Sequence, residues 1–170
     1  MPKSCSAIVL SVLFLGGMVR ADHLPDSLLA GGRPENVLAG IDLEHTTLAQ
    51  VVSKWGQPTT VQEEDYYWDK GTFKLHLIIE STKEQGEYIA AIEIEGNKFP
   101  DSLGRTGRGL RLGDSLRDLI RIYGKKFQRH RVPLYDVDEV SIQWRREEIT
   151  LDAQFDSRGK IKILTLLAPE

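Results

Sequence analysis

Residues capable of chemistry are scattered along the sequence, and none forms a spacing that defines a catalytic centre. The acids Glu63-Glu64-Asp65 are typical of a solvated turn, and no serine lies in a G-x-S-x-G or S-x-x-K motif. The four histidines show neither an HExxH motif nor another spacing typical of a metal site: His23, His45, His76 and His130. The sequence therefore predicts a protein that is not an enzyme and uses no metal or cofactor. An enzyme with an unrecognised site is the last-ranked alternative.

Alternation in the predicted strands points instead to a binding surface. His76 lies between Leu75 and Leu77, so it faces away from the side on which these leucines are buried. Exposed aromatic groups on a sheet face free of helices could anchor a partner protein. An ordinary solvated sheet face explains the pattern equally well. The candidate protein-binding face consists of Tyr67, His76, Ile78, Gln143, Arg145 and Asp152.

A second candidate surface is basic. Residues 22–97 contain 5 bases and 14 acids, whereas residues 98–170 contain 15 bases and 11 acids. The basic stretch could meet anionic lipid or polysaccharide, although pairing with acids inside the fold is the favoured interpretation. Nucleic acid is excluded because the whole chain has a net charge of −3 and aromatic residues do not interleave with the bases. The candidate anionic-surface patch consists of Arg117, Arg121, Lys125, Lys126, Arg129 and Arg131.

Two short helices are expected to position these surfaces, over residues 47–55 and 115–123. Their apolar residues recur at i, i+3, i+4 and i+7, which places them on one stripe. Thr47 and Ser115 are suited to cap the helix starts, and Gly56 and Gly124 to end the helices. A shift of 68 residues superimposes one segment on the other, so an internal duplication is predicted.

Alternating segments after each helix predict three strands per copy. The predicted fold class is α+β, with two tandem helix-plus-antiparallel-meander repeats that form one sheet with both helices on one face. The predicted organisation is a signal peptide at 1–21, an N-terminal segment at 22–37, the first repeat at 38–96, a linker at 97–108 and the second repeat at 109–170. The linker is assigned from its Gly, Pro and Ser content.

The first 21 residues predict export. They contain no acid, an early Lys3, and an apolar run from Ala7 to Met18 that is too short to cross a membrane. Small residues at Val19 and Ala21 predict cleavage after Ala21, although Arg20 leaves an uncleaved anchor open. The chain after Ala21 contains no cysteine, so a packed core must stabilise it.

Several short motifs resemble a known repeat family. They are Gly109-Leu110-Arg111-Leu112-Gly113-Asp114-Ser115, the helix ending Tyr123-Gly124, the aromatic strand at Trp144, and Trp55-Gly56-Gln57-Pro58 of the first copy. Together they resemble the β-lactamase-inhibitor-protein-like superfamily, which includes the outer-membrane assembly lipoproteins of the BamE (SmpA/OmlA) type. The resemblance implies an exported, non-catalytic protein that binds another macromolecule through its sheet or loops. The chain departs from the BamE type in having two copies and no lipid-bearing cysteine.

The predicted function is an exported, periplasmic or secreted protein-binding module of the cell envelope, with an unidentified protein partner. The alternative is an envelope structural protein that contacts anionic lipid or polysaccharide through its basic second repeat.

Overall fold

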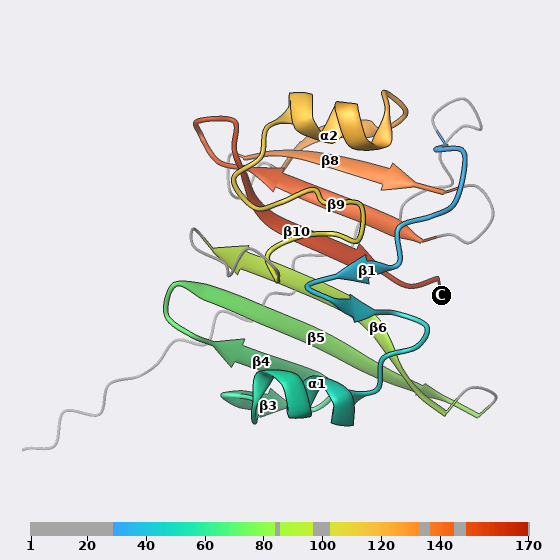
Figure 1. The fold of residues 1–170 in the computed structure, drawn as a ribbon, viewed down its shortest axis with the longest axis vertical. Coiled ribbons are helices and arrows are strands. Elements are labelled where there is room, and N and C mark those ends of the chain that lie inside the picture. Colours follow the sequence, from blue (N-terminus) through green and yellow to red (C-terminus); the bar gives the residue numbers. More distant parts are fainter. Residues whose placement is uncertain (1–28, 84–85, 97–102, 133–136, 145–148, 170) are drawn as a thin grey trace, which may run out of the picture.

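A single eight-stranded antiparallel sheet dominates the computed structural model, which describes residues 29–83, 86–96, 103–132, 137–144 and 149–169. The strand order is β3-β4-β5-β6-β10-β9-β8-β7 (Figure 1). The strands are β3 (Thr60–Gln62), β4 (Asp65–Asp69), β5 (Phe73–Thr82), β6 (Gly86–Gly96), β7 (Gln128–Val132), β8 (Val137–Gln143), β9 (Thr150–Phe155) and β10 (Ile161–Leu167). No helix in these described ranges is long and apolar enough to span a membrane.

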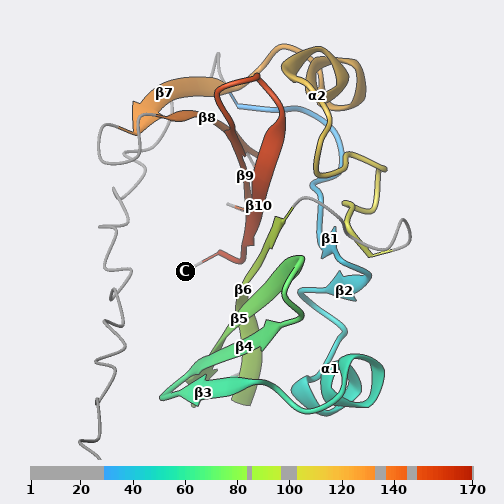
Figure 2. The ribbon, with the colours of Figure 1, turned by 90° about the vertical axis from the view of Figure 1, so that its left-hand side faces the viewer.

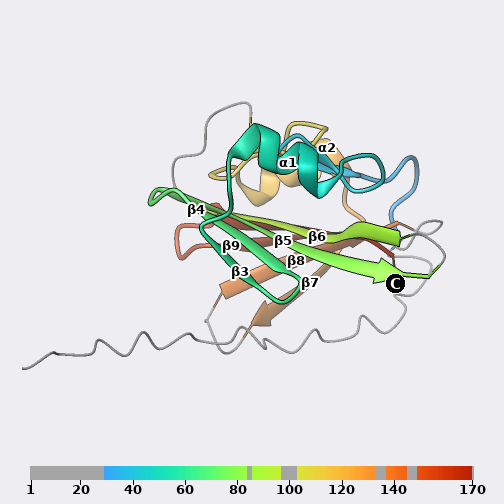
Figure 3. The same cartoon turned by 90° about the horizontal axis from the view of Figure 1, so that it is seen from below.

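Both helices, α1 (Leu48–Trp55) and α2 (Leu116–Tyr123), cover the same face of the sheet (Figure 3). Each begins with a capping box, at Thr47 and Ser115, as the sequence predicts. A short ribbon of β1 (Val37–Leu38) and β2 (Ile41–Asp42) lies on the same side, between the two helices (Figure 2). None of the described helices lies on the opposite face, and the sheet curves so that its edges at β3 and β7 turn away from the helices (Figure 2).

The hydrophobic core lies between the sheet and these covering elements. Along β9, and from Leu75 to Ile79 in β5, every second side chain is buried, which is the pattern of strands with one covered face. From the helices, Val51, Trp55 and Leu119 enter this core. The sheet contributes the fully buried Trp68, Leu75, Leu77, Ile92, Ile94, Ile142, Leu151, Leu164 and Leu166.

The structure corrects the predicted fold class. The sequence pattern predicts an α+β protein built of two tandem helix-plus-meander repeats with six strands, whereas the protein is mostly β, with one eight-stranded antiparallel sheet and helices of only eight residues each in its described ranges. The edge strands escape prediction because they lack apolar alternation. All three residues of β3 are exposed, and β7 reads Gln-Arg-His-Arg-Val.

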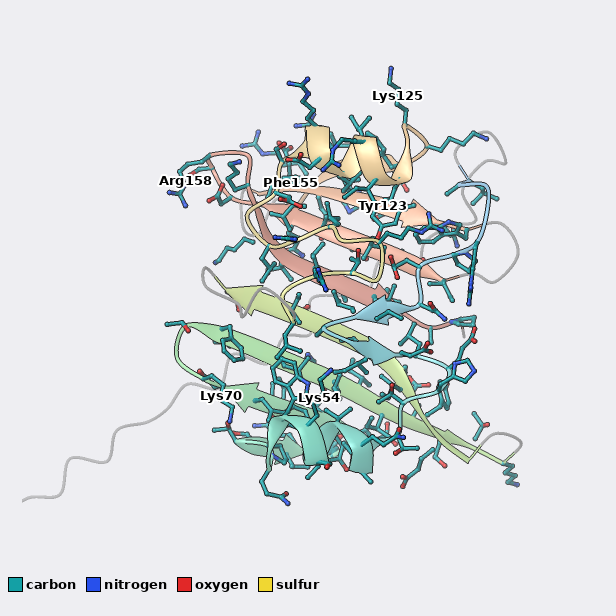
Figure 4. All side chains as sticks on the ribbon, viewed as in Figure 1. Lys54, Lys70, Tyr123, Lys125, Phe155 and Arg158 are labelled. Atoms are coloured by element: carbon teal, nitrogen blue, oxygen red, sulfur yellow. The ribbon has the colours of Figure 1, made fainter. Side chains whose placement is uncertain are left out.

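A buried polar network ties the N-terminal segment to α2. Glu35 is only 3% exposed, and its Oε2 accepts hydrogen bonds from the Tyr123 hydroxyl at 2.6 Å and from the Arg108 backbone N–H at 3.1 Å. Its Oε1 accepts from the Val37 N–H at 3.1 Å. The Tyr123 hydroxyl also lies 2.7 Å from Oγ1 of Thr106, which is 2% exposed. Figure 4 labels Tyr123 at the end of α2.

Part of the predicted 97–108 linker belongs to this network. Residues 97–102 lie outside the described residues. In the described part, Thr106 pairs with Leu38 in an isolated bridge, and the Arg108 guanidinium lies 5.4 Å from the ring centroid of Tyr123. Burial, and the neighbouring Glu35 carboxylate, raise the pKa of Tyr123, so the hydroxyl keeps its proton and donates it.

Candidate functional site on the helix-free face

One row of side chains crosses the helix-free face of all eight strands. Its members are directly opposite one another in each successive pair of strands. The central members, from His76 on β5 to Ser141 on β8, each lie between two residues that are buried on the other face. In strand order the row reads Thr60, Tyr67, His76, Glu93, Thr165, Asp152, Ser141 and Gln128. We call these residues the polar row.

An aromatic pair occupies the first half of the polar row. The rings of Tyr67 and His76 stack with centroids 4.3 Å apart and an interplanar angle of 9°. His76 Nε2 lies 2.5 Å from Asp65 Oδ1, so the carboxylate holds the ring in place. Burial raises the pKa of Tyr67, with smaller contributions from the negative charges of Asp65 and Glu93. The stacking and the contact with Asp65 therefore hold both rings in one orientation.

The centre of the polar row contains a carboxylate that is largely removed from water. Burial raises the pKa of Glu93, while His76 and a hydrogen bond from Thr165 act in the opposite direction. The Thr165 hydroxyl donates to Glu93 Oε2 at 3.2 Å. The neighbouring Glu95 forms ion pairs with Lys74 at 3.6 Å and with Lys162 at 3.3 Å, one on each adjacent strand.

The second half of the row contains the most perturbed carboxylate. Burial raises the pKa of Asp152 from 3.8 to about 6, and the charge of Glu139 acts in the same direction. A hydrogen bond with Ser141 and the charge of His130 oppose the rise. Asp152 Oδ1 is nevertheless buried without any hydrogen-bond partner.

A second unpartnered acceptor lies close by. Gln143 is 9% exposed, and its Oε1 is buried without a hydrogen bond. Its partner across the strands is Thr150, two residues from Asp152, so Gln143 and Asp152 are diagonal neighbours on β8 and β9. Both oxygens can accept a hydrogen bond, and no described residue supplies the donor.

The predicted protein-binding residues fall on this face as far as the structure describes them. Alternation places Tyr67, His76, Ile78, Gln143 and Asp152 there together. Arg145 lies outside the described residues. The sequence reasoning missed Glu93, Thr165 and Glu139. A signal for Glu93 was available, because it lies between the apolar Ile92 and Ile94 in an alternating segment that predicts a strand.

The predicted basic patch is partly neutralised within the fold. Arg121 pairs with Asp118 at 3.5 Å, and Arg129 pairs with Asp138 at 2.7 Å. Arg131 also interacts within the protein. Arg117, Lys125 and Lys126 are exposed, and they form no ion pair with another described residue. Lys125 extends away from the sheet beyond α2 (Figure 4).

Two further clusters contain groups that could bind ions. The half-buried Asp42 and the exposed Glu44 and His45 bring their ligand atoms within 4.8 Å of one another. However, Asp42 Oδ1 already accepts the backbone N–H groups of Glu44 and His45. A depression of about 300 Å³ is lined by Gly96, Gly113, Asp156, Arg158, Lys160, Ile161 and Lys162. Two of its three cations, Arg158 and Lys162, already pair with Asp156 and Glu95.

Comparisons with known proteins assign no family to the chain. No family model matches it, and no curated protein matches it. Among solved structures it is similar to the crystal structure of a DUF4309 family protein (YjgB) from Bacillus subtilis subsp. subtilis str. 168. The two are 14% identical with a TM-score of 0.49, and the match covers 76% of this chain and 83% of that chain. The resemblance to the β-lactamase-inhibitor-protein-like superfamily stays a prediction.

Proposed function

We propose that the protein is an exported, non-catalytic module that binds another protein of the cell envelope on the helix-free face of its sheet. The observation that supports this proposal is the pair of buried, unpartnered acceptors at Asp152 and Gln143. A buried acceptor without a donor costs about 1–3 kcal/mol of stability, so folding alone gives no reason to keep it. A partner that supplies donors does give a reason.

The other half of the face offers an anchor of the kind that concentrates binding energy. Tyr67 is stacked on His76, and Ile78, two residues after His76 in β5, lies on the same face. Aromatic side chains that are already held in one orientation lose little conformational entropy on binding. The face thus combines an apolar contact with polar groups in need of partners.

Site-specific cross-linking tests this function. A photoreactive phenylalanine analogue at position 67 should capture a protein in the intact envelope of cells that produce the chain, and Tyr67→Ala with His76→Ala should abolish binding of the captured protein. The matched control places the same analogue at Ser53, which is exposed on α1. Equal capture from both positions, or binding unaffected by the double substitution, would contradict the proposed face.

Export is part of the proposal and has its own test. Residues 1–21 lie outside the described residues, so the support comes from their sequence alone. N-terminal sequencing of the protein recovered from the envelope or medium should begin at Asp22. A chain that retains Met1 in the cell interior would contradict export.

A second candidate function uses the exposed part of the basic patch. Arg117, Lys125 and Lys126 are exposed and free of ion pairs with other described residues, so they could contact anionic lipid or polysaccharide. Under this function, Lys125→Glu with Lys126→Glu should abolish binding to vesicles rich in anionic lipid at low salt. Charge reversal at Lys70 and Lys83, which are exposed in the first half, is the control. Equal loss in both double variants would indicate non-specific attraction.

A further inference from the structure

We propose that Asp152 and Gln143 form a recognition site for an arginine side chain of the protein that binds the helix-free face. This inference rests on the proposed function and specifies the chemistry of the partner. Asp152 Oδ1 and Gln143 Oε1 are acceptors on adjacent strands, and both are buried without a donor. A guanidinium has five N–H donors in a planar fork, so one side chain can satisfy both oxygens.

The neighbouring acids Glu139 and Glu93 already have partners within the chain. Glu139 Oε1 lies 2.6 Å from His130 Nε2, and Glu139 Oε2 accepts from Gln154 Nε2 at 2.7 Å. Glu93 Oε2 accepts from Thr165. Asp152 is the carboxylate of the described polar row that retains a buried oxygen with no partner.

Local charge also favours a cation at this site. His130, whose charge lowers the pKa of Asp152, is already paired with Glu139. Asp152 is ionised at neutral pH although burial disfavours its charge. A cation beside it would therefore stabilise the ionised carboxylate. Arginine is favoured over lysine because a guanidinium is more weakly hydrated and loses less on entering a buried position.

An incoming group can reach the site from the open side of the sheet. Asp152 is half-buried as a residue although its Oδ1 is covered. The terminal torsion of an aspartate side chain is soft, so the carboxylate can turn Oδ1 toward an approaching donor. Neither of the two helices in the described part of the chain covers this face (Figure 3).

A titration with small probes tests the assignment on the full chain. The probe is N-acetyl-L-arginine methylamide, added to isotope-labelled protein at pH 7.5 and followed by the amide signals of residues 141–143 and 150–154. We expect saturable shifts with a dissociation constant on the order of 1 mM. The citrulline analogue, which has the same shape without the charge, should bind at least about tenfold more weakly. Equal binding of the citrulline or the lysine analogue would overturn the guanidinium assignment.

Two variants locate the site. Asp152→Asn should weaken binding of the arginine probe at least about tenfold. Asp138→Asn is the matched control, because Asp138 lies on β8 opposite Phe155, on the core-facing side, and should leave binding unchanged. A well-dispersed amide spectrum of each variant shows that it folds. Unaltered binding by Asp152→Asn would refute the inference.

The binding should also depend on pH. Asp152 has a pKa of about 6, and the groups facing it are Ser141 and Glu139 on β8, His130 on β7 and Thr165 on β10. Protonation of Asp152 removes the negative charge that attracts the guanidinium, so binding should weaken as the pH falls from 7.5 to 5. Binding that is independent of pH in this range would count against Asp152 as the ligand group.

The outcomes separate this inference from the proposed function. If cross-linking at position 67 captures a partner that binds wild type and Asp152→Asn equally, the arginine site is wrong and the binding face stands. If position 67 captures nothing while the arginine probe binds in an Asp152-dependent manner, the arginine site stands and the protein-binding function fails.

Discussion

Removal of one hydroxyl group tests whether the Glu35 network stabilises the fold. Tyr123→Phe deletes the group that donates to Glu35 Oε2 at 2.6 Å and lies 2.7 Å from Thr106 Oγ1. The ring itself stays, including its edge-to-face contact with Trp144 at a centroid distance of 5.9 Å. The substitution therefore changes hydrogen bonding while it preserves most of the packing.

The expected loss follows from the charge and burial of the acceptor. A hydrogen bond to a charged group contributes about 1.5–3 kcal/mol, compared with about 1 kcal/mol for a neutral pair. Glu35 would keep two backbone donors, from Val37 and Arg108, each at 3.1 Å. We expect the free energy of unfolding to fall by about 2 kcal/mol, which for a chain of this size lowers the Tm by about 4–8 °C.

Urea unfolding at pH 7.5 measures this difference, and Tyr66→Phe is the matched control. Tyr66 is half-buried against the same core, and its hydroxyl makes no hydrogen bond to another described residue. The control should change the free energy of unfolding by less than about 0.5 kcal/mol. Equal losses in the two variants would show that the loss comes from packing, and a loss below about 0.5 kcal/mol in Tyr123→Phe would refute a stabilising network.

Three further variants test the core network, a helix cap and the charged site. Gly107→Ala should destabilise the protein, because the new Cβ would lie 2.8 Å from Glu35 Oε1, and urea unfolding should show a loss that Gly31→Ala, placed in open space, does not. Ser115→Ala removes the α2 cap, so unfolding should show a loss of about 1 kcal/mol, whereas Ser157→Ala in an exposed turn should be neutral. Folding raises the Asp152 pKa from 3.8 to about 6, so the native state holds a proton that the unfolded chain releases, and this group's contribution to stability falls by up to about 3 kcal/mol as the pH rises from about 4 to 6. Asp152→Asn should remove that fall and raise stability at pH 7.5 in chemical unfolding, and a wild-type pH profile in the variant would show that another group titrates.

Local signals in the sequence predicted the helices and much of the core correctly. The hydroxyl caps at Thr47 and Ser115, with Gln50 and Asp118 three residues later, satisfy backbone groups within one turn, so no distant contact is needed to recognise them. Strict alternation likewise identified Leu75 and other buried strand residues, because one covered face imposes a period of two. These features depend on neighbours in the chain.

The features that the sequence did not reveal depend on distant contacts. Glu35 resembles any surface acid in the sequence, and only the approach of Tyr123 and Arg108 makes it a buried acceptor. The edge strands β3 and β7 exist because β4 and β8 supply their hydrogen bonds, although their own side chains carry no periodic apolar signal. Alternation placed Asp152 on the predicted binding face, but alternation alone does not reveal that one of its carboxylate oxygens is buried.

The two buried carboxylates differ in a way that separates structural from binding roles. Glu35 has donors on both oxygens, all from the chain itself, so its burial is compensated within the folded state. Asp152 has a buried oxygen with no donor and a raised pKa, so the native state is less stable with this side chain ionised than with a neutral one. Substitution of the first should therefore lower stability, whereas substitution of the second should raise stability and weaken binding. Changes of opposite sign in the free energy of unfolding would show that Glu35 supports the fold and that Asp152 does not. That result is expected for Asp152 if the side chain is retained to bind a partner, because selection for stability alone would not keep it.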